Sequence, residues 1–455
     1  MFAAALGDVV KVLPLLVGVG SVALTAKLWA DYRRPAAVPP GTSAAPLAWT
    51  GVDNVPVLGQ LNRLKWIITD PVGLVWRSMP HGAVFTIRIP TFGDLTYVLF
   101  DDAYRMVMSL PADHAAIGPV LANVPTVGFW FPRTGDDHDS LQELVLTGRR
   151  TMAELLPAAR VAELPDDAAT IVKAVAGKWD STVDLAQVVP YLVYELVGRY
   201  FCGPQQWARL GPRVAPLFRD IAGGVDVVRA MLATTPYHYG MREYRATRQL
   251  QAALAAHPDT TSPCGAAVAA LGLDPLDAEW MRMYVLWNAT AYPGSYTFWT
   301  LYDILTRPQL LARIRALPTA AQRRELLGRC LLETLRLYPV SSLIRELRKP
   351  LEFTYGTTTY HLPAHTLVGV FPAGINRSLG TDYDPDRHPG TKFAGFGRGV
   401  YGCIAADFSK TVTAAVLEEL LQHYDFHLTG PAPARLVRVH QTYPSAPVPA
   451  TVSPR

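Results

Sequence analysis

The feature that most constrains the fold of this chain is a glycine-rich loop that delivers one cysteine to an apolar helix pattern. The loop runs from Phe396 to Cys403, and the helix pattern that follows it continues through Leu421. Helix-start N–H groups and the positive end of the helix dipole stabilise an anion, so this position favours a thiolate. Such a thiolate can bind a haem iron, and glycines let the loop pass close beneath a flat macrocycle. The alternative for an isolated loop of this kind is a turn that buries an unreactive thiol.

Composition limits the class of protein. The chain has 455 residues, of which 50% are hydrophobic and 18% are charged, so we expect a globular protein with a large core. The net charge of +4 is small and no basic cluster is interleaved with aromatic residues, so we expect no nucleic-acid partner. The four cysteines are scattered, which suits a reducing compartment better than a disulfide framework.

The N-terminal region predicts a membrane anchor. An apolar run covers Val12–Ala26, and Arg33 and Arg34 follow it before several prolines. Basic residues directly after a short span place the next domain on the cytosolic side. The alternative, a cleaved signal peptide, is disfavoured because no small-x-small site follows the run. We therefore expect an anchor over residues 1–31, a basic and proline-rich hinge over 32–50, and the folded domain over 51–455.

The remaining pattern predicts a mainly helical, α+β fold with small sheets. Residues 81–89 and 95–100 carry β-branched and aromatic residues on either side of a turn, which predicts a β-hairpin. From about 100 to 340 the pattern is mostly helical, and residues 353–370 return to strand-like composition. The last thirty residues are proline-rich and predict strand and loop.

A second group of residues supports the interpretation of the cysteine loop. Glu333 and Arg336 lie three residues apart in a strongly helical segment and can pair on one face. Arg345 follows nine residues after Arg336, and a Pro-Asp-Arg segment ending at Arg387 precedes the loop. A single Glu–Arg pair is usually a solvated surface pair. These residues are therefore informative only because they occur together with the cysteine loop.

The cysteine loop resembles that of the cytochromes P450, Phe-Gly-x-Gly-x-Arg-x-Cys-x-Gly. Phe396, Gly397, Gly399 and Cys403 match this pattern. Tyr401 stands where the family usually has Arg or His, and Ala405 stands where it usually has Gly. The resemblance implies the cytochrome P450 fold and a haem b cofactor whose iron is ligated by Cys403.

The resemblance also implies roles for the other residues. Phe396 would pack beside the sulfur, and Gly397 and Gly399 would shape the loop. Arg345 and Arg398 would meet the haem propionates, with the Tyr401 hydroxyl where the family has a cation. The family's Trp-x-x-x-Arg pattern is missing; the pair at 149 and 150 is a possible substitute, or a solvated basic pair. A structural triad that fixes the segment under the haem would consist of Glu333, Arg336 and Arg387.

A third informative segment is an apolar helix pattern that contains Pro293 and Gly294. A proline within a helix removes one backbone hydrogen bond and kinks it. The segment resembles the distal helix of the P450 branch that contains cholesterol 7α-hydroxylase, sterol 12α-hydroxylase and prostacyclin synthase. Residues 280–302 contain no Asp or Glu, so protons for oxygen cleavage would pass through hydroxyls and water. The catalytic candidates are Thr290, Tyr292 and Ser295.

These inferences lead to one expected function and two alternatives. We expect a monooxygenase that oxidises an apolar, sterol- or lipid-like substrate, anchored as a single-pass protein in the endoplasmic reticulum membrane with its catalytic domain in the cytosol. Electrons would come from a donor like NADPH-cytochrome P450 reductase, docking near Arg348, Lys349 and Lys410. The first alternative is a prostacyclin-synthase-like isomerase of a lipid peroxide, which needs no external electrons. The second is a non-catalytic haem-binding descendant of the fold.

Overall fold

The computed structural model describes eleven stretches of the chain. They are residues 38–46, 75, 77–78, 82–89, 93–100, 102–123, 138–224, 242–339, 343–387, 393–437 and 442–455. The predicted anchor over 1–31 and most of the predicted hinge over 32–50 lie outside these residues. Within them, the only helical stretch long and apolar enough to cross a membrane is Gly399–His423, and part of it is buried in the helical body.

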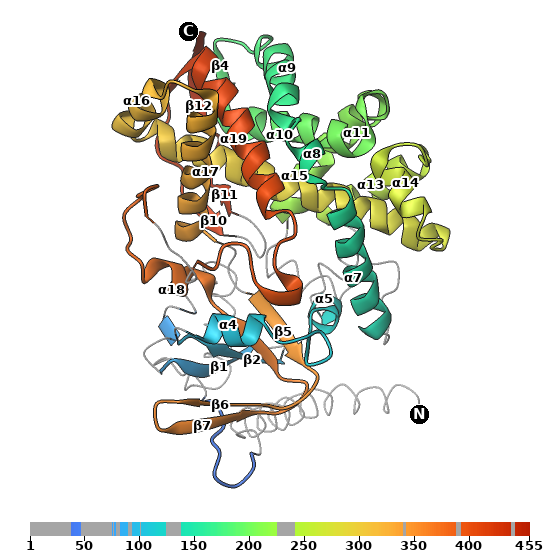
Figure 1. Cartoon of the computed structure of the whole chain (residues 1–455), viewed down its shortest axis with the longest axis vertical. Coiled ribbons are helices and arrows are strands. Elements are labelled where there is room, and N and C mark those ends of the chain that lie inside the picture. The colour runs from blue at the N-terminus through green and yellow to red at the C-terminus, as the bar shows by residue number, and fades with distance from the viewer. Residues whose placement is uncertain are drawn as a thin grey trace, which may run out of the picture.

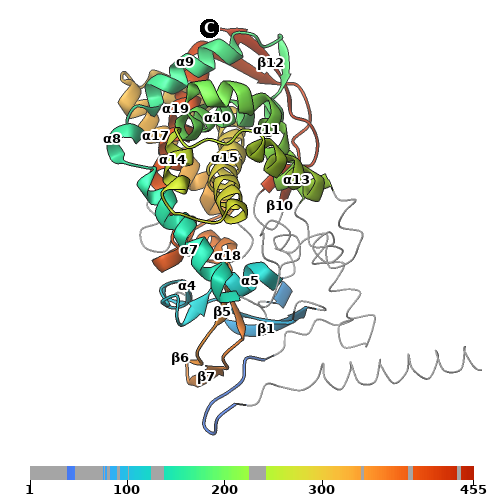
Figure 2. The ribbon, with the colours of Figure 1, turned by 90° about the vertical axis from the view of Figure 1, so that its right-hand side faces the viewer.

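The helices form a body around one long central helix, α15 (Figures 1 and 2). The α-helices are α4 (Ala103–Met108), α5 (Gly118–Asn123), α7 (His138–Glu154), α8 (Ala158–Val161), α9 (Leu164–Ala176), α10 (Leu185–Cys202), α11 (Pro204–Gly224), α13 (Arg242–Ala255), α14 (Pro263–Ala269), α15 (Pro275–Leu305), α16 (Pro308–Ala316), α17 (Ala320–Leu337), α18 (Pro372–Arg377) and α19 (Ala406–His423). Helix α15 packs against α10, α17 and α19, so most of its length is covered.

The sequence specifies where the two helices that carry the site begin. Asp274 caps α15, because its carboxylate accepts the backbone N–H groups of Leu276 and Asp277 at 3.0 and 3.1 Å. Helix α17 begins with a capping box, in which Thr319 and Gln322 each accept the other's backbone N–H. Large aromatic residues then fix these helices in the core, including Trp207, Trp280, Trp299 and Phe298, all at most 2% exposed.

The strands form small sheets, and the largest lies below the helical body in Figure 1. The strands are β1 (Val84–Ile89), β2 (Gly93–Val98), β3 (Ala115–Ala116), β4 (Thr182–Asp184), β5 (Leu343–Leu347), β6 (Leu351–Tyr355), β7 (Thr358–Leu362), β8 (Leu367–Val370), β9 (Tyr424–Leu428), β10 (Arg435–Val437), β11 (Thr442–Pro444) and β12 (Pro449–Pro454). The five-stranded sheet has the order β1-β2-β8-β5-β3, with β2 and β8 parallel and the other pairs antiparallel.

The predicted elements agree with this architecture. The hairpin over 81–100 is β1 and β2, the strand-like region over 353–370 is β6 to β8, and the helix after the cysteine loop is α19. The Pro293–Gly294 pair, where a kink is predicted, lies inside α15, which is helical through both residues. Buried packing of α15 against three other helices outweighs the weak local helix preference of this Pro-Gly pair.

Candidate functional site

The cysteine loop is held in a shape that only glycine allows at two positions. Gly397 and Gly399 have φ values of +67° and +63°, which side-chain-bearing residues rarely adopt. A Cβ on Gly399 would lie 2.3 Å from the carbonyl oxygen of Met108 in α4. The backbone N–H of Cys403 donates to the carbonyl of Phe396 at 2.6 Å, which closes the loop. The loop therefore presents Cys403 from a tightly packed backbone.

A cavity of about 310 Å³ lies between this loop and α15. Phe396, Tyr401 and Cys403 line it from the loop, and α15 contributes Tyr292 and Tyr296 among others. Its walls are mostly apolar and aromatic, and its size falls within the range of small-molecule sites. The structure thus brings four of the seven residues predicted to bind the cofactor, Phe396, Gly397, Tyr401 and Cys403, to one cavity, while Arg345, Arg398 and Gly399 lie outside its lining.

The surroundings of the Cys403 sulfur contain opposing influences. Burial raises the pKa of the thiol above its ordinary value, while the backbone N–H of Ala405 and the charge of Arg149 lower it. The N–H contact at the start of the helix is the one that the sequence predicts. The prediction that the loop by itself favours a thiolate was incomplete, because desolvation outweighs these contacts. Coordination to a metal displaces the thiol proton, so binding of iron would overcome this cost.

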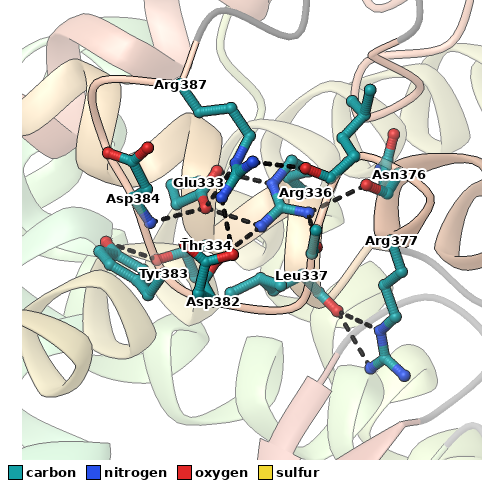
Figure 3. A network of polar contacts seen from close by, with 12 residues as sticks. Glu333, Thr334, Arg336, Leu337, Asn376, Arg377, Asp382, Tyr383, Asp384 and Arg387 are labelled. Carbon is teal, nitrogen blue, oxygen red and sulfur yellow. Dashed lines mark hydrogen bonds and ion pairs between the residues drawn. The ribbon is translucent and has the colours of Figure 1, made fainter.

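The predicted Glu-Arg-Arg triad forms a buried polar network (Figure 3). Arg336 is fully buried and makes two parallel hydrogen bonds of 2.7 Å to the carboxylate of Glu333. Its remaining N–H groups donate to the backbone carbonyls of Asn376, Gly380 and Asp382. This side chain therefore ties α17 to the segment that leads from α18 toward the cysteine loop.

Arg387 completes the network from the other side (Figure 3). Its Nε lies 3.7 Å from the Glu333 carboxylate, and its guanidinium also pairs with Asp382 at 2.8 Å. The backbone N–H of Asp384 donates to Glu333 at 2.8 Å. The three residues that the sequence predicted as a triad are thus in contact through the single carboxylate of Glu333.

Arg345 lies outside the cavity lining but against the ring of Tyr401, which lines the cavity. It is 4% exposed, and its guanidinium carbon lies 4.3 Å from the ring centroid of Tyr401. Burial lowers the pKa of Arg345 to about 10, so the group stays charged at neutral pH. Its Nη1 donates to the carbonyl of Ile344, and its Nε has no hydrogen-bond partner among the described residues.

Sequence reasoning missed two residues near this group, Gln142, which contacts Tyr401, and Tyr104, which lies near Arg345. Gln142 of α7 accepts the backbone N–H groups of Ile117 and Gly118 and donates to the Tyr401 hydroxyl. Tyr104 of α4 is 2% exposed, and its hydroxyl has no partner among the described residues. The only available signal for Gln142 was its position in the helix where the family's Trp-x-x-x-Arg pattern was sought. Nothing in the local sequence singles out Tyr104.

The donor groups of Arg345 and Tyr104 fit the carboxylates of a haem. Burial raises the pKa of Tyr104 to about 12, while the charges of Arg398 and Arg345 lower it, so the phenol keeps its proton next to two cations. Buried donors and cations without an acceptor are costly unless an anion pairs with them. A ligand with two propionates would supply such anions to Arg345 and Tyr104, while Cys403 would hold its iron. The residues present therefore fit the group.

The structure separates the three predicted proton-donating residues. Thr290 donates to the carbonyl of Leu286 at 2.6 Å, and Ser295 donates to the carbonyl of Thr442 at 2.8 Å. Neither residue lines the cavity, whereas Tyr292 does. The catalytic assignment of Thr290 and Ser295 is therefore corrected: their hydroxyls satisfy buried backbone groups instead of facing Cys403.

Arg149 and Arg150 are neighbours in α7 but lie in different environments. Arg149 lines the cavity and donates to the carbonyl of Gly402 at 2.5 Å, directly before the cysteine. Arg150 pairs with Glu143 at 2.6 Å on the surface, with 61% of its side chain exposed. The sequence left open whether this pair replaces the family's Trp-x-x-x-Arg pattern or is a solvated basic pair. The second description applies to Arg150 only.

Comparisons with known proteins agree with this site. Residues 295–437 match the cytochrome P450 family model. No curated protein matches the chain by sequence. A six-coordinate cytochrome P450 from Thermus thermophilus is similar in structure, with a TM-score of 0.63, 19% identity and coverage of 85% of this chain and 98% of its own.

Two further solved structures support the same fold. A P450 from a second strain of Thermus thermophilus has a TM-score of 0.63 and 18% identity, covering 87% of this chain and 97% of its own. A cyanobacterial P450 with retinoic acid bound has a TM-score of 0.71 and 16% identity, covering 91% of this chain and all of its own. These likenesses show the cytochrome P450 fold, and residues 295–437 match the model of that family, whose members bind haem through a cysteine thiolate.

Proposed function

We propose that this protein is a haem-thiolate monooxygenase that oxidises an apolar, sterol- or lipid-like substrate. The observation that carries the proposal is that Cys403 opens into a cavity whose opposite wall is the apolar and aromatic face of α15. Apolar walls with few polar groups bind apolar ligands and exclude water from the reacting atoms. The structural relative that holds retinoic acid, an apolar chain with one carboxylate, is consistent with this class of substrate.

Different residues around the cavity would have different roles. Haem, when bound, supplies the iron that binds and activates dioxygen. Cys403 would hold that iron, and the Ala405 N–H would stabilise the sulfur's negative charge. The Glu333–Arg336 network keeps the preceding segment in place. The aromatic ring of Tyr296 is fixed by a hydrogen bond of 3.1 Å from its hydroxyl to the Tyr338 carbonyl.

Of the three hydroxyl-bearing residues predicted to be catalytic, Tyr292 is the one that lines the cavity. Burial raises the pKa of its phenol far above the ordinary value, so it keeps its proton at neutral pH. It can therefore donate a hydrogen bond into the cavity but cannot serve as a base there. The carbonyl of Ala289 lies beside it without a helical donor, because Pro293 has no N–H. This phenol and this carbonyl can order a water or a polar end of the substrate.

The protein would also need an electron donor and a membrane anchor. A reductase of the NADPH-dependent type would supply electrons, and the apolar run over 12–26 would anchor the protein in the endoplasmic reticulum membrane with the domain in the cytosol. The predicted docking cations Arg348, Lys349 and Lys410 each pair with a neighbouring aspartate at 2.5–2.6 Å. A partner with an acidic face would have to compete with these surface pairs, which are weak in water.

The decisive experiment is the absorption spectrum of the reduced protein saturated with carbon monoxide, with Cys403→Ser as the control. A strongly red-shifted Soret band that is lost in the variant establishes thiolate ligation by Cys403. Turnover of sterol and fatty-acid substrates is then measured with a reductase and NADPH. A protein that binds no haem, or one whose carbonyl spectrum matches histidine-ligated haem, contradicts the proposal and leaves the non-catalytic alternative.

A second candidate is a lipid-peroxide isomerase, which needs no external electrons. One observation favours it: α15 presents no carboxylate to the cavity, and two of its three predicted hydroxyls are bonded to backbone. The test is conversion of a lipid endoperoxide without NADPH or reductase. Product formed only in the presence of the reductase excludes this candidate.

A further inference from the structure

Arg149 is the one cation among the described residues that line the cavity, and it contacts the loop that carries Cys403. Its Nη2 donates to the carbonyl oxygen of Gly402, the residue directly before the cysteine. It comes from the last part of α7 and lines the cavity together with Cys403. Its partner is therefore the backbone of the ligand loop itself, and no carboxylate pairs with it among the described residues.

The peptide between Gly402 and Cys403 is hydrogen-bonded on both sides. Its carbonyl accepts the Arg149 guanidinium at 2.5 Å, and its N–H donates to the carbonyl of Phe396 at 2.6 Å. A cationic donor on the carbonyl polarises the peptide and strengthens the hydrogen bond that its N–H makes. The orientation of the Cys403 backbone is thus set from α7 as well as from within the loop.

The guanidinium also lies near the sulfur, because it lines the same cavity and holds the carbonyl of the residue directly before Cys403. A positive charge beside an anionic iron ligand reduces the electron density that the ligand gives to the metal. It also favours the reduced metal, which carries one more electron than the oxidised metal.

We infer that Arg149 is a positioning residue for the iron ligand, which holds the Gly402–Cys403 peptide and raises the reduction potential of the haem by placing a positive charge beside the thiolate. This inference rests on haem ligation by Cys403, and it does not depend on which reaction the protein catalyses. It assigns to Arg149 a role different from pairing with a haem propionate, the role considered from the sequence.

The neighbouring Arg150 provides a matched control. It is on the same helix, one residue away, but it is exposed and paired with Glu143. Arg150→Gln removes the same formal charge from the protein while leaving the cysteine loop untouched. A change in potential caused by net charge would appear in both variants, whereas one caused by contact with the loop would appear in Arg149 variants only.

The test is the ferric–ferrous equilibrium of the haem-loaded protein, measured against a redox dye. In Arg149→Gln we expect the ratio of ferrous to ferric haem at a fixed dye potential to fall about three- to tenfold, the effect of removing a charge in a partly screened site. Arg149→Lys should retain part of the wild-type ratio, because it keeps the charge, and it remains informative if the Gln variant folds poorly. Arg150→Gln should match the wild type.

Three results would overturn the inference. An unchanged equilibrium in both Arg149 variants excludes an electrostatic role beside the thiolate. Equal shifts in Arg149→Gln and Arg150→Gln assign the effect to net charge. Faster transfer of haem to excess apomyoglobin with an unchanged equilibrium assigns Arg149 to a propionate instead. The carbonyl spectrum with Cys403→Ser is recorded in parallel, so failure of cysteine ligation is distinguished from failure of this inference.

Discussion

Arg336 and Arg345 are both buried arginines near the haem site, but their environments are opposite. Arg336 is fully buried and meets the carboxylate of Glu333 with two hydrogen bonds, and its other N–H groups meet three backbone carbonyls. Arg345 is 4% exposed and has one carbonyl, the face of Tyr401, and an Nε without a partner among the described residues.

The difference separates a residue that serves the fold from one that serves a ligand. A buried cation whose donors are all matched by the protein contributes to the folded state, and removing its partner leaves an uncompensated charge. A buried cation whose donors are only partly matched costs free energy until an anion arrives. The two positions should therefore respond in opposite ways to the same substitution.

The largest effect is expected for Arg336→Met. It leaves the Glu333 carboxylate buried without its cation, and breaking such a pair costs about 3–5 kcal/mol of folding free energy. We expect poor yield of folded protein whether or not haem is supplied during expression. The yield of soluble protein and its far-UV circular dichroism measure this effect. A fully folded variant that lacks only haem would mean that the network serves the cofactor rather than the fold.

The next largest effect is expected for Arg345→Met, which should weaken haem binding and leave folding unchanged. Removing a buried cation that has no carboxylate partner among the residues the structure describes should leave the secondary structure and the yield unchanged. Loss of a charge-assisted hydrogen bond to a haem carboxylate should weaken haem binding about 10- to 100-fold. The ratio of haem to protein and the rate of haem transfer to apomyoglobin test this. A variant that retains haem as well as the wild type does would separate Arg345 from the cofactor.

Tyr104→Phe should sharpen the comparison with a smaller effect. The substitution removes a buried hydroxyl that lacks a partner among the described residues, so the folded protein should lose no stability without haem. One hydrogen bond from an uncharged phenol to a carboxylate is worth about 1–2 kcal/mol. Its loss should accelerate haem transfer to apomyoglobin about 5- to 30-fold. Tyr97, whose side chain packs in the sheet against Phe85, offers a matched Tyr→Phe control. Equal rates in both variants would exclude Tyr104 from the haem site.

The sequence predicted the parts of this site that depend on local pattern. Gly397, Gly399 and Cys403 stand close together in the chain, and the Glu333–Arg336 pair is one helical turn, so spacing was sufficient. The position of Arg345 in a strand after α17 was also predicted, because the family resemblance extends over that region. The coarse fold followed from periodicity, and α15 continues through the Pro-Gly pair.

The remaining contacts could not be predicted, because they join segments far apart in the chain. Gln142 and Tyr401 are 259 positions apart, and Arg149 and Gly402 are 253 apart. No periodicity within α7 indicates which of its polar residues faces the cysteine loop. The placement of Thr290 and Ser295 at the cavity was not correct for a related reason. A hydroxyl on a buried helix can donate to a backbone carbonyl or face a cavity, and the sequence does not distinguish the two.

The smallest effect concerns a third environment for arginine, an exposed ion pair. Asp386 lies between Arg313 and Arg329 at 2.5 and 2.6 Å, and 46% of its side chain is exposed. The hydrogen bond from Arg313 is the main cause that lowers the pKa of Asp386 below its usual 3.8. The unfolded chain therefore binds a proton at a higher pH than the folded chain does. The stabilisation is present above about pH 4 and is lost as the pH falls toward the folded-state pKa.

Asp386→Asn tests this by comparing urea unfolding midpoints with those of the wild type between pH 3 and pH 7. Because solvent screens an exposed pair, the variant should be less stable by at most about 1 kcal/mol at pH 7, with the difference shrinking below pH 4. Added salt should shrink the difference at pH 7 as well. A loss as large as that of Arg336→Met would mean that the exposed cluster is part of the same network as Glu333. A loss that persists undiminished at pH 3 would show that the carboxylate's charge is not what stabilises this segment.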